Sequence, residues 1–594
     1  MSKQEMLWNL NNIVGRGKFD EFFNAAEKNI AKLGDYLKAL SPGMPEESFR
    51  RMTAFTEKLK EDINRLSSYG SLWVSADINS QDARLYKSRA QDLMVSHTQA
   101  LIPITQWLMG KPVEGLGRLD DANAQRLFKA VPDLEYVLSY QRLGAVHTLE
   151  QEVEKVMARK KVTGADPLTE LYSLVSDGFE YRFKPKGKKE KVFKTQSRIR
   201  AYFYSSNPAE RQAAYQALFK PYQDNISKFY VIYQALAKDW DQDARDRQFN
   251  SAVAMRNFYN QVPDQAIETL LRVSSDNVGI YQEYFKVKAR LLGVKQLQRY
   301  DIYAPLERQK AKIPFDRAKT LVLETFKEFS PALAQNARQI FEAGHIDSHP
   351  RPGKESGAFC AMVAPKITPY ILLNYSGDNS SVMTMAHELG HGAHDLYASA
   401  HSVSSAETTL PLAETASTTA EMLVFERLLS QAKSDKEKRA MLLEKIGDSY
   451  ATVMRQAYFV KFEIAAHRLL LQGARESQLS GLYLKMLKEQ FGSSVDVADE
   501  FRCEWAYIPH IFKTPFYCYA YNFGELLSMA LFARYKHEGR SFVSKIEKIL
   551  AYGGSQSPEL ILKQAGIDMS SASFWQGSYD VVRGWLEELK RLSK

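Results

Sequence analysis

Cysteine is scarce in this chain, with only Cys360, Cys503 and Cys518 among 594 residues. So few cysteines, in an odd number, exclude a disulfide framework of the kind that stabilises small secreted domains. The N-terminal residues show no basic segment followed by an apolar one, so we expect no secretory signal and a cytoplasmic protein with reduced thiols. No stretch approaches the roughly 18 uncharged apolar residues of a membrane span, so we expect no membrane partner.

Charge of one sign is not abundant either. The chain has 79 basic and 70 acidic residues, a net charge of +9, with both signs mixed along the sequence. The densest basic run, residues 184–194 (KPKGKKEKVFK), is typical of an exposed hairpin tip, and no zinc-finger spacing or RNA-recognition signature accompanies it. We therefore expect no nucleic-acid partner. A composition of 45% hydrophobic and 25% charged residues indicates a globular protein with a sizeable core.

Helical periodicity dominates the sequence. Apolar residues recur at three- and four-residue steps, most clearly in residues 19–40, 48–66, 81–101, 210–237 and 439–472. Pro208 after Asn207 favours a helix start, because proline suits the first helical position. We therefore predict a mainly α fold.

Strand signals are few and short. Residues 180–183 and 191–194 flank a Gly/Lys-rich turn and are predicted to pair as a hairpin. Residues 365–375 (PKITPYILLNY) are β-branched and aromatic and are bounded by turn residues, which indicates a strand. Pro369 within this segment favours an edge strand or a strand start.

The polar residues in suggestive arrangements lie almost entirely in the second part of the chain. We place a boundary near residue 195, between an N-terminal helical lobe (1–194) and a second lobe (195–594). Residues 344–357, rich in Gly, Pro and His, are predicted to form a long loop of the second lobe.

Histidines cluster in one segment. Four of the eleven fall within fifteen positions: His387, His391, His394 and His401. Residues 387–391 (HELGH) match the H-E-x-x-H pattern, in which two imidazoles four residues apart share one helix face and can bind one metal ion. Glu388 lies where it can act on a metal-bound water without being a ligand.

The helix that carries this motif is predicted to span Val382–Ala398, with Ser380 or Ser381 as its N-cap. Two exposed histidines on a surface helix are the alternative interpretation. The apolar residues around the motif favour a buried helix, in which an unpaired His-Glu-His set is costly without a metal.

A catalytic zinc site needs a third protein ligand and an open fourth position. Downstream, Pro411 favours a helix start, and Glu414 and Glu421 lie two turns apart on one face of that helix. We predict Glu414 as the third ligand and Glu421 as a supporting carboxylate that orients a ligand imidazole. Glu407 and His394 are the alternatives for the third ligand, and an ordinary surface or ion-paired role is the alternative for Glu421.

These motifs resemble those of the thimet oligopeptidase and oligoendopeptidase F family of zinc metallopeptidases. HELGH is followed after 22 residues by Glu414 in LAETAS, and residues 357–375, 510–523 and 562–575 resemble the corresponding family segments. The resemblance is closest to the oligoendopeptidase F branch. It implies a two-lobed helical body that encloses a deep substrate channel, with a small β-sheet beside the zinc helix, and one Zn²⁺ per chain.

The tyrosine-rich segment Pro509–Asn522 (PHIFKTPFYCYAYN) is the other candidate region. A strand would place its three tyrosines on one face, and a loop leading into a helix over residues 523–535 is the alternative. The resemblance implies that His510, Tyr517 and Tyr521 act on the transition state and that Tyr519 contacts substrate, with Tyr517 and Tyr519 interchangeable in this assignment. Aromatic packing is the alternative interpretation.

The predicted activity is hydrolysis of internal bonds in short unstructured peptides by a zinc-dependent oligoendopeptidase. Zinc bound by His387, His391 and Glu414 would activate a water, and Glu388 would take its proton. Two alternatives remain. One is a zinc exopeptidase of the dipeptidyl carboxypeptidase or aminopeptidase type. The other is a non-catalytic peptide-binding scaffold with a remnant zinc site.

Overall fold

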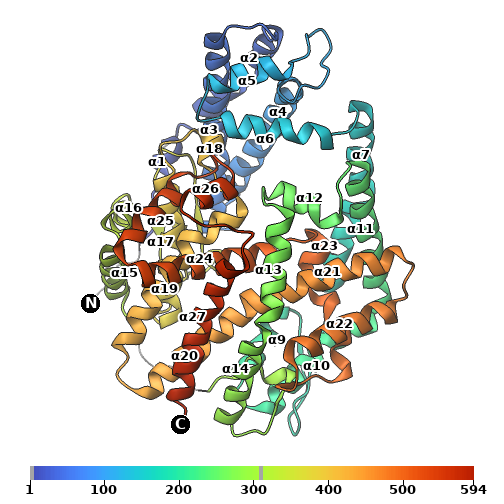
Figure 1. Cartoon of the computed structure of the whole chain (residues 1–594), viewed down its shortest axis with the longest axis vertical. Coiled ribbons are helices and arrows are strands. Elements are labelled where there is room, and N and C mark those ends of the chain that lie inside the picture. The colour runs from blue at the N-terminus through green and yellow to red at the C-terminus, as the bar shows by residue number, and fades with distance from the viewer. Residues whose placement is uncertain (1–5, 16, 307–311) are drawn as a thin grey trace. The chain divides into compact units, whose positions relative to one another are not determined.

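The computed structural model describes residues 6–15, 17–306 and 312–594 (Figure 1). About 71% of the chain is helical and its strands are few and short, which confirms the mainly α prediction. In these described ranges, no helix combines the length and the apolar character that a membrane crossing requires.

The chain divides into two compact units, each built from three separate stretches of sequence. Unit 1 comprises Met1–Val146, Lys310–Ser430 and Arg534–Ile567. Unit 2 comprises His147–Gln309, Gln431–Ala533 and Asp568–Lys594. The predicted boundary near residue 195 lies inside unit 2, so the two sequence-contiguous lobes stay a prediction.

Unit 1 begins with three long helices, α2 (Phe19–Lys38), α3 (Glu46–Ala76) and α4 (Gln81–Leu108), which pack against one another. They confirm three predicted helices, two of which extend further along the chain than the apolar periodicity indicated. Aromatic side chains fill the space between them, with the rings of Phe19 and Tyr86 4.4 Å apart.

A three-stranded sheet lies in the same unit, in the order β4 (Ile346–Asp347), β6 (Tyr370–Leu372), β5 (Phe359–Ala361). β4 runs parallel and β5 antiparallel to β6. The strand predicted within residues 365–375 is therefore confirmed, but it is the central strand and not an edge. Pro369 immediately precedes it, which satisfies the strand-start alternative, because a proline there removes no ladder hydrogen bond.

Unit 2 contains the predicted hairpin, in which β1 (Tyr181–Phe183) pairs antiparallel with β2 (Lys191–Phe193). The segment predicted as one helix over residues 210–237 forms two helices, α10 (Pro208–Asp224) and α11 (Ile226–Asp246). Asn225 separates them with a non-helical backbone (φ −112°, ψ 13°).

A π-helical turn, Tyr450–Met454, interrupts the helix predicted over residues 439–472. It separates α20 (Asp435–Ser449) from α21 (Arg455–Leu471). Side chains donate to backbone carbonyls of this turn: Asn522 Nδ2 to Val453 (3.0 Å), Gln490 Nε2 to Met454 (3.3 Å) and Gln456 Nε2 to Ala451 (3.4 Å). Such turns are rare in helices and are frequent at functional sites. This turn directly precedes α21 and therefore sets the orientation of its first residue, Arg455.

Candidate active site

The H-E-x-x-H motif lies on α17 (Asn379–Tyr397), which confirms the predicted helix. Its N-cap is Asp378, whose carboxylate accepts a hydrogen bond from the Ser381 amide (2.8 Å). The predicted cap at Ser380 or Ser381 is therefore wrong. The helix begins earlier, at Asn379, and aspartate is as good an N-cap as serine. One side of α17 is fully buried and consists of Val382, Met385, Ala386 and Leu389.

A second helix, α19 (Leu410–Gln431), brings Glu414 to the two histidines of α17. Glu414 Oε2 lies 3.4 Å from His387 Nε2 and 3.5 Å from His391 Nε2. These distances exceed those of ordinary N–H···O hydrogen bonds, about 2.7–3.2 Å. They match the spacing of about 3.3 Å between two ligand atoms that surround one zinc ion tetrahedrally at about 2.05 Å. The donor set and its spacing therefore fit a zinc ion.

The two helices cross at Gly390, between the histidines. A β-carbon at this position would lie 2.6 Å from Ser417 Cα and 2.8 Å from the Ala416 carbonyl oxygen. Only glycine permits so close an approach of two backbones. The glycine of the HELGH motif thus sets the distance between Glu414 and its two partners.

Glu421, two turns after Glu414 on α19, contacts the other side of the first histidine. Its Oε2 lies 3.4 Å from His387 Nδ1. A carboxylate on Nδ1 fixes the orientation of an imidazole and leaves Nε2 available to a metal. This position fits the supporting role predicted for Glu421.

A cavity of about 680 Å³ in unit 1 is lined by His387, Glu388 and His391 and by Phe359 and Cys360 of β5. Glu388 is 7% exposed, and its carboxylate has no ion pair or hydrogen bond with the residues that the structure describes. Burial raises its pKa, against the opposing charges of His387 and His391. A carboxylate in such a position is well suited to accept a proton.

The two alternatives for the third ligand lie elsewhere on the cavity wall. His394 is buried, its Nε2 lies 3.2 Å from Thr408 Oγ1, and burial lowers its pKa to about 4. Glu407 is exposed. Within the described ranges, the group able to hold a metal consists of His387, His391 and Glu414, whose ligand atoms lie within 4.8 Å of one another.

Sequence reasoning missed Asp395, which lines the same cavity. Burial raises its pKa to about 7, and its Oδ2 is 3.9 Å from Cys360 Sγ on β5. The signal was present in the sequence, because Asp395 follows His391 by one helical turn and therefore shares its face.

The predicted tyrosine-rich segment lies in unit 2 and contains no strand. It consists of the short helix α23 (Pro509–Lys513), a loop, and the start of α24 (Tyr519–Glu538). The rings of His510, Tyr517 and Tyr521 form one cluster, with centroids 5.2–6.0 Å apart. All three side chains are partly exposed.

Tyr519 does not belong to this cluster. Its side chain is 0% exposed, and its hydroxyl accepts a hydrogen bond from Asn260 Nδ2 at 2.7 Å. A fully buried side chain has no surface for a substrate, so the structure does not support the substrate-binding role predicted for Tyr519. Of the two interchangeable tyrosines, the geometry favours Tyr517.

The loop before α24 is held from within unit 2. Phe516 has φ 59°, which is rare for a bulky residue, and its amide donates to Glu463 Oε1 at 2.8 Å. Arg256 Nε donates to the Pro515 carbonyl at 2.9 Å. Glu463 is 1% exposed, and burial raises its pKa to about 8, against the Phe516 amide and the charge of Arg256. These buried contacts fix the position of Tyr517.

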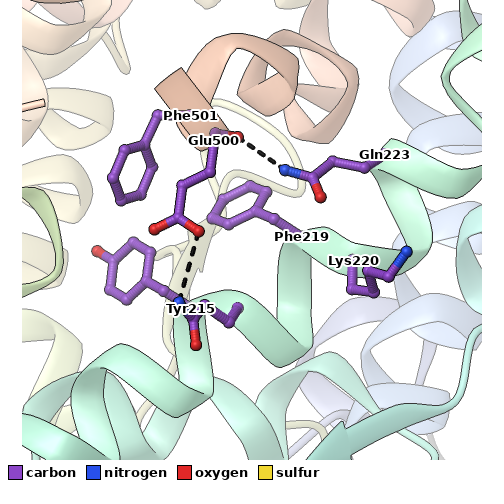
Figure 2. Close-up of a pocket in the computed structure, with 7 residues that line it drawn as sticks. Tyr215, Phe219, Lys220, Gln223, Glu500 and Phe501 are labelled. Carbon is purple, nitrogen blue, oxygen red and sulfur yellow. Dashed lines mark hydrogen bonds between the residues drawn. The ribbon is translucent and has the colours of Figure 1, made fainter. Parts of the chain in front are cut away.

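A second, smaller pocket of about 220 Å³ lies elsewhere in unit 2 (Figure 2). Its aromatic wall is formed by Tyr215, Phe219 and Phe501. Figure 2 shows the polar groups at its rim bonded to one another: Gln223 Nε2 donates to the Glu500 carbonyl at 2.8 Å. None of the residues predicted as functional lines this pocket.

The sequence of this chain matches known proteins. Residues 201–581 match the model of peptidase family M3. An oligoendopeptidase F homologue from Lactococcus lactis is 24% identical over 604 residues, which cover 99% of this chain and 97% of the relative. Oligopeptidase PepF from Bacillus subtilis is 24% identical over 599 residues, with 99% and 88% coverage.

Solved structures share the fold. A crystal structure from Chlamydophila abortus superposes with a TM-score of 0.86 at 22% identity, covering 100% of this chain and 99% of that one. Oligoendopeptidase-F from Enterococcus faecium gives a TM-score of 0.70 at 21% identity, with 97% and 98% coverage. With the H-E-x-x-H motif on α17, Glu414 on α19 and a family match over more than half of its length, the chain belongs to peptidase family M3.

Proposed function

We propose that this chain is a zinc-dependent oligoendopeptidase that hydrolyses internal bonds of short, unstructured peptides. The observation that carries the proposal is the convergence of His387, His391 and Glu414 beside the unpaired carboxylate of Glu388. A purely structural zinc site needs no neighbouring base, whereas a hydrolytic site does.

One zinc ion per chain would be held by the two Nε2 atoms and the Glu414 carboxylate, leaving a fourth position open. Bound there, zinc supplies Lewis-acid chemistry, which lowers the pKa of water and polarises a carbonyl group. Glu421 holds the His387 imidazole with Nε2 toward Glu414.

Glu388 then acts as the general base and acid. Its carboxylate takes the proton of the attacking water and delivers it to the leaving amine nitrogen. The raised pKa of the buried carboxyl group supports this role, because a more basic carboxylate accepts the proton more readily.

His510, Tyr517 and Tyr521 are proposed to donate hydrogen bonds to the substrate carbonyl oxygen as it gains negative charge. Neutral O–H and N–H donors suit this task, and burial, followed by the charges of Arg455 and Lys513, lowers the pKa of His510. The partial exposure of all three side chains supports the assignment.

The proposed partners are short peptides, and the proposed location is the cytoplasm, with neither nucleic acid nor membrane as a partner. The decisive experiment incubates the protein with a mixed peptide pool, with and without a chelator, and identifies cut sites by mass spectrometry. Chelator-sensitive internal cuts support the proposal. Cleavage that requires a free peptide end, tested with end-blocked peptides, would assign an exopeptidase, and absence of cleavage would assign a scaffold.

A further inference from the structure

Arg455, the first residue of α21, carries a half-buried guanidinium group that lacks a carboxylate partner. Its Nη1 donates to the Tyr303 hydroxyl at 2.5 Å, and its Cζ lies 5.9 Å from the centre of the Phe459 ring. Its Nε is buried without a hydrogen-bond partner, and in the described part of the chain no carboxylate lies within ion-pair distance. A buried charge left in this state is costly to the fold.

Other buried arginines of unit 2 are paired. Arg211, 3% exposed, bonds to Asp301 at 2.7 Å, and Arg299, 7% exposed, contacts Glu504 at 3.2 Å. Glu504 is the buried carboxylate whose charge acts on Arg455, but it is bonded to Arg299 instead. The two fully buried arginines thus have carboxylate partners, whereas the half-buried Arg256 and Arg455 have none in the described part of the chain.

The surroundings of Arg455 are cationic and rich in tyrosine. The charges of Arg455 and Lys513 both act on His510, and those of Arg200 and Arg455 both act on Tyr507. Neither Arg200 nor Lys513 forms an ion pair with any residue that the structure describes. Acidic groups act in the same region: Glu504, which is bonded to Arg299, acts on Tyr507, Asp448 acts on Tyr204, and Glu463 acts on Cys518. The cationic groups without an ion pair among the described residues attract an anion.

Arg455 is also fixed next to the aromatic cluster of His510, Tyr517 and Tyr521. It directly follows the π-helical turn Tyr450–Met454, and Asn522, the residue after Tyr521, donates to the Val453 carbonyl in that turn (3.0 Å). The guanidinium group and the cluster thus belong to one rigidly connected part of unit 2.

We propose that Arg455 and Tyr303 form a subsite that binds a carboxylate of the peptide substrate. Guanidinium groups bind carboxylates through charge-assisted N–H···O bonds, and Nη2 of this partly exposed side chain has no partner among the described residues. Because Tyr303 accepts its bond from Arg455, its own O–H proton is available to the same carboxylate. The carboxylate is either the C-terminal group of the peptide or an aspartate or glutamate side chain. The inference rests on the proposed peptidase function.

The test compares fluorogenic peptides of one sequence that differ only in a free or amidated C-terminus, and a second pair that differs by Glu or Gln. We expect the wild-type protein to prefer the free acid or the Glu peptide, by about 10- to 100-fold in kcat/KM, as is typical for a hydrogen-bonded charge pair. Arg455→Gln should erase that preference, so that kcat/KM falls about 10- to 100-fold more for the carboxylate peptide than for its uncharged counterpart. Arg455→Lys should retain part of it, and Tyr303→Phe should weaken it.

Arg502→Gln is the matched control, because Arg502 is exposed and pairs with Asp499 at 3.0 Å. It should keep the full preference, and melting temperatures should show that every variant is folded. Equal loss of both peptides in folded Arg455→Gln, or an unchanged preference, would overturn the proposal.

Anisotropy of the same labelled peptides bound to Glu388→Gln separates this subsite from the proposed function. A carboxylate-dependent binding that requires Arg455, without cleavage by the wild-type protein, supports the subsite and rejects the peptidase. Cleavage without any carboxylate preference supports the peptidase and rejects the subsite.

Discussion

Gly390 offers a sharp test of how the metal site is assembled. Replacing it with alanine places a β-carbon 2.6 Å from Ser417 Cα, whereas ordinary contacts begin at 3.4 Å, so α17 and α19 must separate by about 0.8 Å. The clash is with backbone atoms, so no rotamer change relieves it. Zinc ligand distances tolerate only about 0.2 Å of error. The helix shift therefore moves Glu414 out of range of at least one histidine.

We expect Gly390→Ala to weaken zinc binding about 10- to 100-fold, a typical effect of changes that misplace a ligand. Alanine alone favours a helix interior over glycine by about 1 kcal/mol. Overpacking costs about 1–3 kcal/mol, so the metal-free protein should lose stability or, at most, break even. Competition with a chromophoric chelator measures the affinity, and urea unfolding measures the stability.

Gly392→Ala is the matched control on the same helix. Its β-carbon would meet Ile340 Cδ1, the end of a flexible side chain, at 2.5 Å, and Cys360 Sγ at 3.5 Å. Because α19 is untouched, zinc affinity should stay close to that of the wild-type protein. Wild-type zinc affinity in Gly390→Ala, together with higher stability, would refute the close crossing as the determinant of the site.

Three further predictions concern chemistry and pH. Glu388→Gln should keep zinc and lose about 10²–10⁴-fold in kcat, whereas Glu414→Ala should lose zinc. Elemental analysis measures the zinc content and steady-state kinetics measures kcat, so a reversed assignment of the two residues would be detected. Loss of zinc in Glu407→Ala alone would identify Glu407 as the third ligand. Tyr521→Phe should lower kcat about 10²–10³-fold with little change in KM, and normal turnover would leave only a packing role. Because burial raises the Glu463 pKa to about 8 from 4.5, the native state retains a proton that the unfolded chain releases, and stability should fall as pH rises through this window. Glu463→Gln should flatten that fall in urea unfolding at pH 5 and 8, and an unchanged slope would contradict it.

The proximity of His387, His391 and Glu414, the proposed metal ligands, was predictable from the sequence because local geometry determines most of it. Histidines four residues apart share a face in any α-helix, whatever packs around it. The choice of Glu414 over Glu407 followed from its place inside a helix that begins near Pro411. The requirement for glycine at position 390 was not predictable, because it depends on where α19 crosses α17, which is a long-range contact.

The tyrosine-rich segment shows that assuming the two-residue period of a strand, where the chain is helical, assigns side chains to the wrong face. Tyrosines two residues apart lie on one face of a strand, but α24 begins at Tyr519, and two helical residues differ by about 200° around the axis. Tyr519 and Tyr521 therefore point in opposite directions, one buried against Asn260 and one toward the cluster. Tyr517 escapes this rule because it lies in the loop before the helix.

Unpaired buried charge distinguishes the residues that serve the fold from those left available for chemistry. Arg211 and Arg299 are each neutralised by a carboxylate within the same unit, as a stable interior requires. Glu388 and Arg455 carry no such partner in the part of the chain that the structure describes, although each is surrounded by protein. A folded chain tolerates this cost where a ligand supplies the missing partner, here the water and the peptide carboxylate that we propose. Glu388 belongs to a sequence motif, and the motif identified it. Arg455 belongs to none, and its surroundings depend on long-range packing, so the sequence did not identify it.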